Sequence, residues 1–283
     1  MAIETIAVLG AGQMGSGIAQ IAAANGYKVI MRDIKQEFCD KGVNTIKKGL
    51  EKQVAKGKTT QEAADAIMAN ISTTVDLAGV APADFVIEAV PEIMSLKQDT
   101  FKQLGEICKP DAILCTNTSS MSITEITGGC KNPERCMGMH FFSPVYAMKL
   151  VEMIRAEKTS DATVQAVREV SEKMGKVPVL CQTDTPGFIV NRCLFAFMLE
   201  AIHEYEDGVA TIDDIDTAIK LGLNHPMGPF EMMDLSGLDT FPHVTEILEK
   251  LPVTTWACPK SVQDKIAEGK FGRKSGEGWH KYN

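Results

Sequence analysis

The sequence is poor in the features that mark membrane, metal-binding and nucleic-acid-binding proteins. No apolar run approaches the roughly 20 residues that a membrane-spanning helix needs. None of the eight cysteines forms a CxxC pair, and no histidine stands at a zinc-ligand spacing from them. Acidic residues outnumber basic ones by 37 to 29, and the net charge of −8 argues against a broad nucleic-acid surface. We therefore expect no membrane, nucleic-acid or metal partner.

Cysteine usage and the start of the chain predict a cytoplasmic globular protein. Most cysteines lie in apolar runs, which is the pattern of reduced core residues in a cytosolic protein. Met1 is followed almost directly by the apolar run Ile6–Leu9, so we expect no signal or transit peptide. The 283 residues are enough for two domains.

The N-terminal segment predicts a dinucleotide-binding βαβ unit. The run at 6–9 is typical of a buried strand, and it leads into the sequence GAGQMG at 10–15. A helix ending at Gly26 and a second strand at 29–31 follow, and Asp33 lies just past that strand. A glycine turn between strand and helix, with an acid after the next strand, is the fingerprint of a dinucleotide-binding fold.

The residues of this glycine turn have separate expected roles. Gly10 permits the tight turn, Gly12 lets a pyrophosphate approach the backbone, and Gly15 lets the helix pack closely. Gln13 and Met14 begin the helix, whose N–H groups and positive dipole end favour phosphates. We predict that these five residues bind the cofactor.

Asp33 bears on the choice of cofactor. Its carboxylate would accept hydrogen bonds from both ribose hydroxyls and repel a 2′-phosphate, which predicts NAD. The adjacent Arg32 leaves an NADP-preferring site open, and the glycines alone are also compatible with FAD.

A helical insert is predicted at about 36–70, as two helices broken at 57–60. Lys48, Lys52 and Lys56 recur every four residues on one face of the first helix. Such a row is typical either of a solvated face or of a seat for the phosphates of a substrate.

Polar side chains follow the next strands. Strands at 85–90 and 113–116 flank a helix at 95–107. Ser119 and Ser120 come directly after the second strand, at the edge where doubly wound sheets bind ligands. Serine is equally typical of a helix N-cap, and we expect one of the two to cap the following helix.

A short hairpin predicts a histidine opposite a glutamate. The apolar runs at 137–142 and 149–154 each hold one ionisable residue, and the break between them is too short for a parallel crossover. Centring the hairpin on Tyr146 places His140 opposite Glu152. The two form either a buried ion pair in which each side chain is the partner of the other, or a general acid/base in which Glu152 fixes the tautomer of His140. Beside a dinucleotide fold we favour catalysis.

The composition changes near residue 184. A helix at 161–174 and a strand at 177–180 complete a domain over 1–184, and only helices are predicted over 185–283. We therefore predict an α/β Rossmann-type dinucleotide-binding domain followed by an all-α C-terminal domain. The C-terminal helices are expected at about 187–206, 212–221, 228–236, 239–250 and 260–268. The first of them is apolar over much of its circumference, which predicts a subunit interface.

Seven stretches together resemble the 3-hydroxyacyl-CoA dehydrogenase family, in particular its short-chain members from butyrate-forming bacteria. They lie at 10–19, 117–120, 139–142, 148–152, 186–192, 224–229 and 272–276. The resemblance covers essentially the whole chain, although it is less typical at 90–93 and weak between 235 and 262.

The resemblance implies an NAD-dependent oxidoreductase. His140 corresponds to the family's catalytic histidine and Glu152 to its partner. Ser119 and Asn191 correspond to residues that hold the 3-oxygen of the substrate and the reacting end of the site. The implied reaction is reversible hydride transfer between NAD(H) and 3-hydroxybutyryl-CoA or acetoacetyl-CoA, in a homodimer formed through the helical domain.

The resemblance also implies binding contacts. Lys52 and Lys56 lie in the inserted helices that contact coenzyme A in the family. Ser143 stands where the family commonly has asparagine; serine is shorter but still offers a donor and an acceptor. On the cofactor side we expect, besides the glycine turn, Asp33, Glu92, Lys97, Asn117, Ser143 and Lys274.

Two other classes of function share many of these residues. A dehydrogenase of a free hydroxy acid would have the same nucleotide fold but no need of a basic insert. A non-catalytic nucleotide sensor would have no need of the pair formed by His140 and Glu152.

Overall fold

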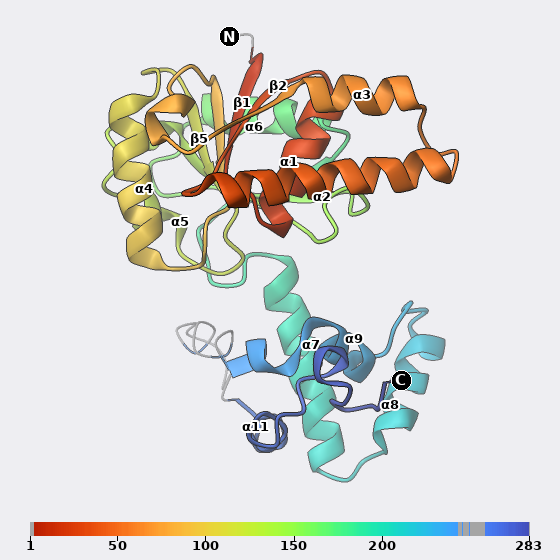
Figure 1. Ribbon diagram of the computed structural model, residues 1–283. Coiled ribbons are helices and arrows are strands. Elements are labelled where there is room, and N and C mark those ends of the chain that lie inside the picture. The colour runs from red at the N-terminus through yellow and green to blue at the C-terminus, as the bar shows by residue number, and fades with distance from the viewer. Residues whose placement is uncertain (1–2, 243–244, 246–248, 250–257, 283) are drawn as a thin grey trace. The chain divides into compact units, whose positions relative to one another are not determined.

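The computed structural model describes residues 3–242, 245, 249 and 258–282. The chain divides into two compact units, Met1–Thr185 and Pro186–Asn283 (Figure 1). Among the residues described, no helix is both long and apolar enough to cross a bilayer.

The first unit is built on one eight-stranded sheet with strand order β3-β2-β1-β4-β5-β6-β7-β8. Every neighbouring pair is parallel except β6 and β7, which are antiparallel. The strands are β1 Thr5–Leu9, β2 Lys28–Arg32, β3 Ile71–Thr74, β4 Phe85–Glu88, β5 Ile113–Thr116, β6 Cys136–Phe141, β7 Leu150–Ile154 and β8 Val177–Cys181.

Helices cover both faces of this sheet (Figure 1). Successive residues of a strand point to opposite faces, so the apolar side chains of each strand are buried on both sides. Ile6 and Val8 of β1 pack under α1, α2, α3 and α6, whereas Ala7 and Leu9 pack under α4 and α5. The helices are α1 Gln13–Ala24, α2 Gln36–Ala55, α3 Gln61–Ala69, α4 Met94–Ile107, α5 Ile123–Thr127 and α6 Asp161–Lys173.

The predicted insert is a helical hairpin of α2 and α3, which lie side by side (Figure 1). Gly57, at a φ of +66°, turns the chain after α2. Thr60 caps α3 by accepting a hydrogen bond from the N–H of Ala63. The break in helical pattern between 57 and 60 is therefore confirmed.

The second unit is mainly helical in the part that the structure describes, with isolated β-bridges that join Glu277 to Gly272 and Lys281. Its core includes Phe230 and Trp279, whose ring centroids are 5.0 Å apart. Its elements are α7 Val190–Glu206, α8 Ile212–Gly222, α9 Pro229–Ser236, η3 Leu238–Thr240, α11 Lys260–Ala267 and η4 Arg273–Ser275.

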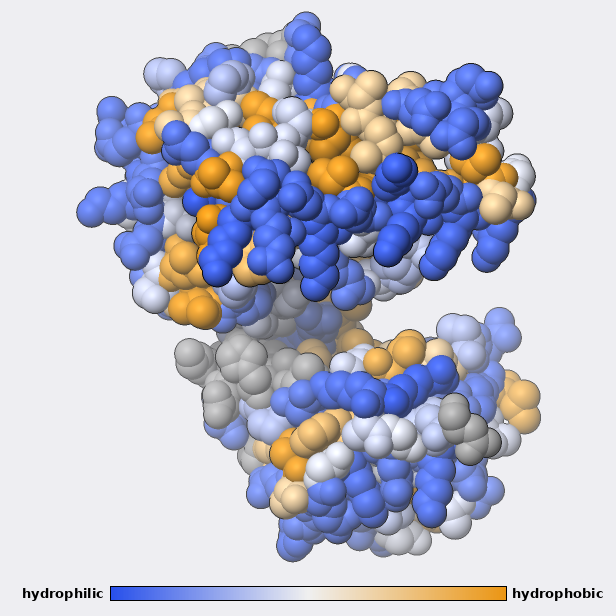
Figure 2. Space-filling model, viewed as in Figure 1, coloured by the Kyte–Doolittle hydropathy of each residue, from blue (hydrophilic) through white to orange (hydrophobic). Residues whose placement is uncertain are grey.

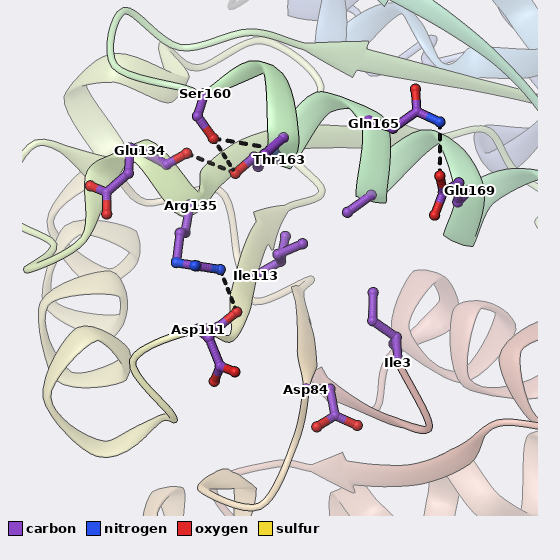
Figure 3. Close-up of a pocket in the computed structure, with 12 residues that line it drawn as sticks. Ile3, Asp84, Asp111, Ile113, Glu134, Arg135, Ser160, Thr163, Gln165 and Glu169 are labelled. Atoms are coloured by element: carbon purple, nitrogen blue, oxygen red, sulfur yellow. Dashed lines mark hydrogen bonds between the residues drawn. The ribbon is translucent and has the colours of Figure 1, made fainter. Parts of the chain in front are cut away.

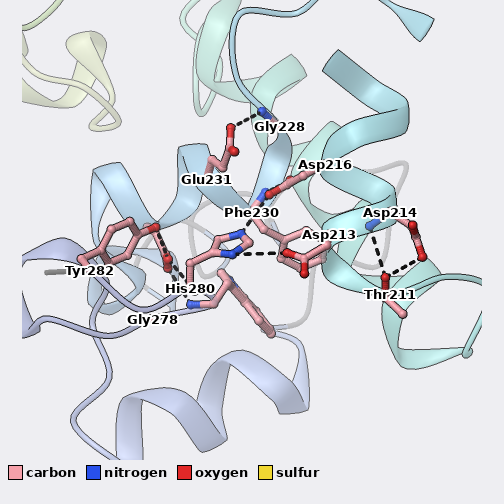
Figure 4. Close-up of polar contacts among 12 residues, drawn as sticks. Thr211, Asp213, Asp214, Asp216, Gly228, Phe230, Glu231, Gly278, His280 and Tyr282 are labelled. Atoms are coloured by element: carbon pink, nitrogen blue, oxygen red, sulfur yellow. Dashed lines mark hydrogen bonds and ion pairs between the residues drawn. The ribbon is translucent and has the colours of Figure 1, made fainter. Parts of the chain in front are cut away.

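Two buried aspartates hold the C-terminal segment within this unit, and Figure 4 shows the first of them, Asp216. Asp216 accepts hydrogen bonds from the N–H of Phe230 and from Nε2 of His280, both at 2.9 Å. Asp234 accepts from the N–H groups of Trp279 and His280 and from the Tyr282 hydroxyl. Burial raises the pKa of the Asp216 carboxyl.

Three local predictions were wrong or fall outside the described residues. The long helix begins at Val190 rather than at 187, because Phe188 adopts a φ of +51°, which no right-handed helix contains. Ser122, not Ser119 or Ser120, caps α5 through the N–H of Glu125. The helix predicted at 239–250 lies half outside the residues described; within them, η3 is followed by helical residues at 241, 242 and 245, and the N–H of Glu249 bonds to the carbonyl oxygen of Thr245.

Candidate functional site

The glycine turn after β1 is shaped as the sequence predicts. Gly10 has a φ of +96°, and a Cβ there would lie 2.4 Å from the carbonyl oxygen of Ala89. A Cβ on Gly15 would lie 1.8 Å from the carbonyl oxygen of Gly10, so the helix can pack against the turn only without a side chain. A Cβ on Gly12 would meet nothing within 4 Å, so the backbone is open to a ligand there.

The start of α1 and the end of β2 provide the chemistry of a dinucleotide site. No side chain caps the N-terminus of α1, so its first N–H groups can serve phosphate oxygens. Asp33 accepts hydrogen bonds from the N–H of Ala11 at 2.8 Å and of Ile34 at 2.7 Å. Its carboxylate is thereby fixed beside the glycine turn, and these residues fit NAD.

The predicted pairing of the hairpin strands is confirmed. His140 and Glu152 are register partners in β6 and β7, and Nδ1 of the histidine lies 2.8 Å from Oε2 of the glutamate. Both side chains are buried. They point to the sheet face that α4 and α5 cover, because Met139 and Met153 beside them point to the other face. With Nδ1 held by a carboxylate, Nε2 is the ring atom suited to exchange a proton with a substrate.

The loop after β5 lies at the same carboxyl edge. Asn117 joins it to β6, because its side-chain oxygen accepts the N–H of Phe141 at 2.8 Å. Thr118 and Ser119 are held by Glu92, whose Oε1 accepts from the Thr118 hydroxyl and the Ser119 N–H, each at 2.8 Å. Ser119 is exposed.

A buried charge network supports this loop, and part of it was missed in the sequence. Lys97 has no exposed side-chain surface and places Nζ 2.8 Å from Glu88 Oε1 and 3.1 Å from Glu92 Oε2. Glu88 also accepts from the N–H of Val90 and the hydroxyl of Thr116. In this structure Lys97 therefore contacts carboxylates, and a direct role in cofactor binding stays a prediction. Glu88 is the one ionisable residue of an otherwise apolar strand, which is the signal that identified His140.

Three further predicted cofactor residues contact one another or the core. Gln13 donates from Nε2 to the Ser143 hydroxyl at 2.9 Å, so α1 reaches the turn that follows β6. Met14 is half-buried against the core of the first unit. Their contacts with a cofactor stay predictions.

The predicted substrate lysines lie on the helical insert. Lys52, in the last turn of α2, and Lys56, its C-cap, are both exposed. Figure 2 shows hydrophilic side chains gathered along this helix. Their role in binding coenzyme A stays a prediction.

Asn191 and Lys274 belong to the second unit. Asn191 lies in the first turn of α7 and is half-buried. Lys274 lies in η4 and its ammonium contacts the carboxylate of Asp239. That these two residues share a site with His140 stays a prediction.

A separate pocket of about 500 Å³ lies at the opposite edge of the sheet (Figure 3). Part of its lining precedes the parallel strands, with Asp84 before β4, Asp111 before β5 and Arg135 before β6, and the rest includes the first turns of α6. No residue predicted for the active site lines it. In open parallel sheets ligands bind at the carboxyl edge, which favours the site around His140.

The fold and the glycine turn define a dinucleotide-binding α/β protein with an attached helical domain. Residues 5–185 match the 3-hydroxyacyl-CoA dehydrogenase, NAD binding domain, and residues 187–282 match the 3-hydroxyacyl-CoA dehydrogenase, C-terminal domain. The chain belongs to the 3-hydroxyacyl-CoA dehydrogenase family, and it is an oxidoreductase with NAD as cofactor.

Individual relatives match over nearly the whole chain. A probable 3-hydroxybutyryl-CoA dehydrogenase of Deinococcus radiodurans is 46% identical over 276 residues, which cover 97% of this chain and 99% of that protein. The 3-hydroxybutyryl-CoA dehydrogenase of Clostridioides difficile is 42% identical over 279 residues, 98% and 99% of the two chains. The crystal structure of (S)-3-hydroxybutyryl-CoA dehydrogenase from Ralstonia eutropha matches with a TM-score of 0.96 at 38% identity, covering 100% of both chains. The family, the fold class and the NAD cofactor expected from the sequence are thus confirmed.

Proposed function

We propose that the protein is a 3-hydroxybutyryl-CoA dehydrogenase, which transfers a hydride reversibly between NAD(H) and C3 of acetoacetyl-CoA or 3-hydroxybutyryl-CoA. Relatives with this activity in their names match almost the whole chain. The observation that carries the proposal is the buried contact between His140 and Glu152. An acid/base pair at the same sheet edge as the glycine turn is needed by a dehydrogenase and not by a nucleotide sensor.

In the proposed mechanism His140 supplies and removes the proton. In reduction the imidazolium donates its Nε2 proton to the 3-oxo oxygen, and in oxidation the neutral ring accepts the hydroxyl proton. Bound NADH supplies the hydride that C3 receives. Glu152 holds Nδ1 and balances the charge of the imidazolium. Ser119 and Asn191 stabilise the charge that develops on the oxygen.

The proposal is tested by following NADH absorbance with acetoacetyl-CoA, with NADH and NADPH side by side. We expect oxidation of NADH with a kcat/KM at least about tenfold above that for NADPH, which corresponds to about 1.4 kcal/mol of differential binding. The reason is that the fixed carboxylate of Asp33 repels a 2′-phosphate.

The other outcomes of this assay are equally informative. Preference for NADPH would keep the reaction, overturn the cofactor preference and point to Arg32, whose buried Nε has no hydrogen-bond partner in the described part of the chain. No oxidation with either cofactor would overturn the proposed function. Assays with free acetoacetate would then separate a dehydrogenase of a free acid from a sensor.

If the lysines of the insert bind coenzyme A, their removal should change the KM for the CoA ester selectively. We expect the double variant Lys52→Ala, Lys56→Ala to raise the KM for acetoacetyl-CoA by about tenfold, as two exposed phosphate contacts of about 0.7 kcal/mol each would contribute. The KM for NADH should stay the same. The control is Lys102→Ala, Lys158→Ala, which removes the same charge from exposed positions outside the insert. An unchanged KM for the ester would leave Lys52 and Lys56 as a solvated surface.

We also propose a homodimer through the helical unit and a cytoplasmic location. Leu221, Leu223 and Leu235 are exposed on this unit, and Phe197 of α7 is only half-buried, which supports an apolar interface. All eight cysteines are free thiols, as is usual in a reducing compartment.

A further inference from the structure

A buried lysine holds the turn that joins β6 to β7. Lys176 lies between α6 and β8 and is 7% exposed. Its Nζ donates to the carbonyl oxygens of Val145 at 2.5 Å and Met148 at 2.7 Å. Burial lowers the pKa of this lysine, and the two carbonyl contacts offset part of the cost of burying its charge.

The same turn lies against the cofactor helix. Val145 packs on α1, where a Cβ on Gly17 would come within 2.9 Å of the valine side chain. Gln13, the first residue of α1, donates to the Ser143 hydroxyl. The turn is thus held by two supports, α1 and Lys176.

This clamped turn lies at the sheet edge that carries the acid/base pair. β7 and β8 are parallel and begin side by side, so Lys176, directly before β8, lies where β6 ends and β7 begins. The turn follows the strand that carries His140 and precedes the strand that carries Glu152. A shift of the turn would therefore move the ends of both strands together with Ser143.

We propose that Lys176 is a positioning residue for the reaction: by holding two carbonyls of the turn, it fixes Ser143 toward the cofactor and keeps His140 and Glu152 aligned for proton transfer. The inference rests on the proposed function, in which these groups face the reacting atoms. An ammonium suits the task because its three donors radiate from one compact head and can bind two carbonyls at once.

The expected effect is large because catalysis depends steeply on geometry. A displacement of about 1 Å at the reacting groups can cost about 10²-fold in rate. We expect Lys176→Met to lower kcat for acetoacetyl-CoA reduction by at least about tenfold and to raise the dissociation constant for NADH by about threefold or more. The KM for the CoA ester should change little, because the lysines of the insert are untouched.

Two further variants separate positioning from stability. Lys173→Met removes a charge from the last residue of α6, three residues before Lys176, where the exposed lysine places its ammonium 4.1 Å from the centroid of the Tyr27 ring; this variant should have normal kinetics. Val145→Ala loosens the other support of the turn and leaves Lys176 in place. It should reproduce the fall in kcat and the weaker NADH binding, at about threefold or more, even if Lys176→Met fails to fold.

Normal kcat and normal NADH affinity in a folded Lys176→Met protein, or in Val145→Ala, would overturn the proposal, even if thermal stability fell. Hydrogen exchange supplies a direct check on the turn. The N–H groups of Ala147 and Met148 bond to the carbonyl oxygen of Pro144 and should exchange faster in Lys176→Met. If the wild-type protein reduced no CoA ester, the proposed function would fail, and NADH affinity would still decide the role of Lys176.

Discussion

His140→Gln should lower the kcat for acetoacetyl-CoA reduction by about 10²–10⁴-fold, the range that a positioned acid–base group contributes. Glutamine can still donate a hydrogen bond to Glu152, so the buried carboxylate keeps a partner, but an amide cannot protonate the 3-oxo oxygen. The dissociation constant for NADH, measured by fluorescence titration, should stay within about twofold. The glycine turn and Asp33 are unchanged in this variant.

A matched control is His203→Gln, which makes the same substitution at an exposed histidine of α7. It should have wild-type kinetics. Near-normal turnover in His140→Gln would remove His140 from the chemistry and leave its contact with Glu152 as a buried structural pair. Loss of both turnover and NADH binding would instead indicate a misfolded sheet edge, which circular dichroism would detect.

The pairing in this hairpin could be predicted because only one alignment satisfies both polar residues. An imidazole and a carboxylate in apolar strands are each costly to bury alone. A slip of one residue would turn the glutamate to the opposite face of the sheet from His140. The turn length and the burial cost therefore lead to the same register, and the observed partners are His140 and Glu152.

The glycine turn and the insert could be predicted for a similar reason, since their signals are local. A Cβ at Gly15 would clash with backbone a few residues earlier in the chain, and a Cβ at Gly10 would clash with backbone at the end of a neighbouring strand. Gly57 and Thr60 mark the end of one helix and the start of the next. Where several candidates lie together the same rules fail, as with the cap of α5, for which Ser122 competes with two earlier serines.

The contacts that support the site could not be predicted from the sequence. Lys176 lies 31 and 28 residues from the two carbonyls that it holds. Every residue carries a backbone carbonyl, so no pattern of residue types in the sequence identifies a particular carbonyl as a hydrogen-bond partner. Lys97 is nine residues from Glu88, and the geometry that brings them together depends on how α4 packs on the sheet. Such contacts follow from tertiary packing, which one sequence does not display.

Lys97→Met should lower the free energy of unfolding by about 3–5 kcal/mol at neutral pH, the usual cost of removing one partner of a buried ion pair. Glu88 would be left without its lysine and with no exposed side-chain surface. Glu92 is 37% exposed and can turn to water, so most of the cost arises at Glu88. Urea denaturation of the purified variant measures the change, and a loss below about 1 kcal/mol would contradict a charged buried pair.

The matched control is the double variant Glu88→Gln, Lys97→Met. Glutamine has nearly the volume of glutamate; its amide oxygen can still accept from the N–H of Val90, and its NH2 group can donate to the Thr116 hydroxyl oxygen. Removing both charges should therefore recover at least about half of the stability that Lys97→Met loses, since a neutral pair leaves no unpaired charge. Activity should not recover in parallel. Without Lys97, Glu92 has lost the ammonium that holds its carboxylate in place to accept the N–H of Ser119. The double variant should therefore fold well but still have a low kcat.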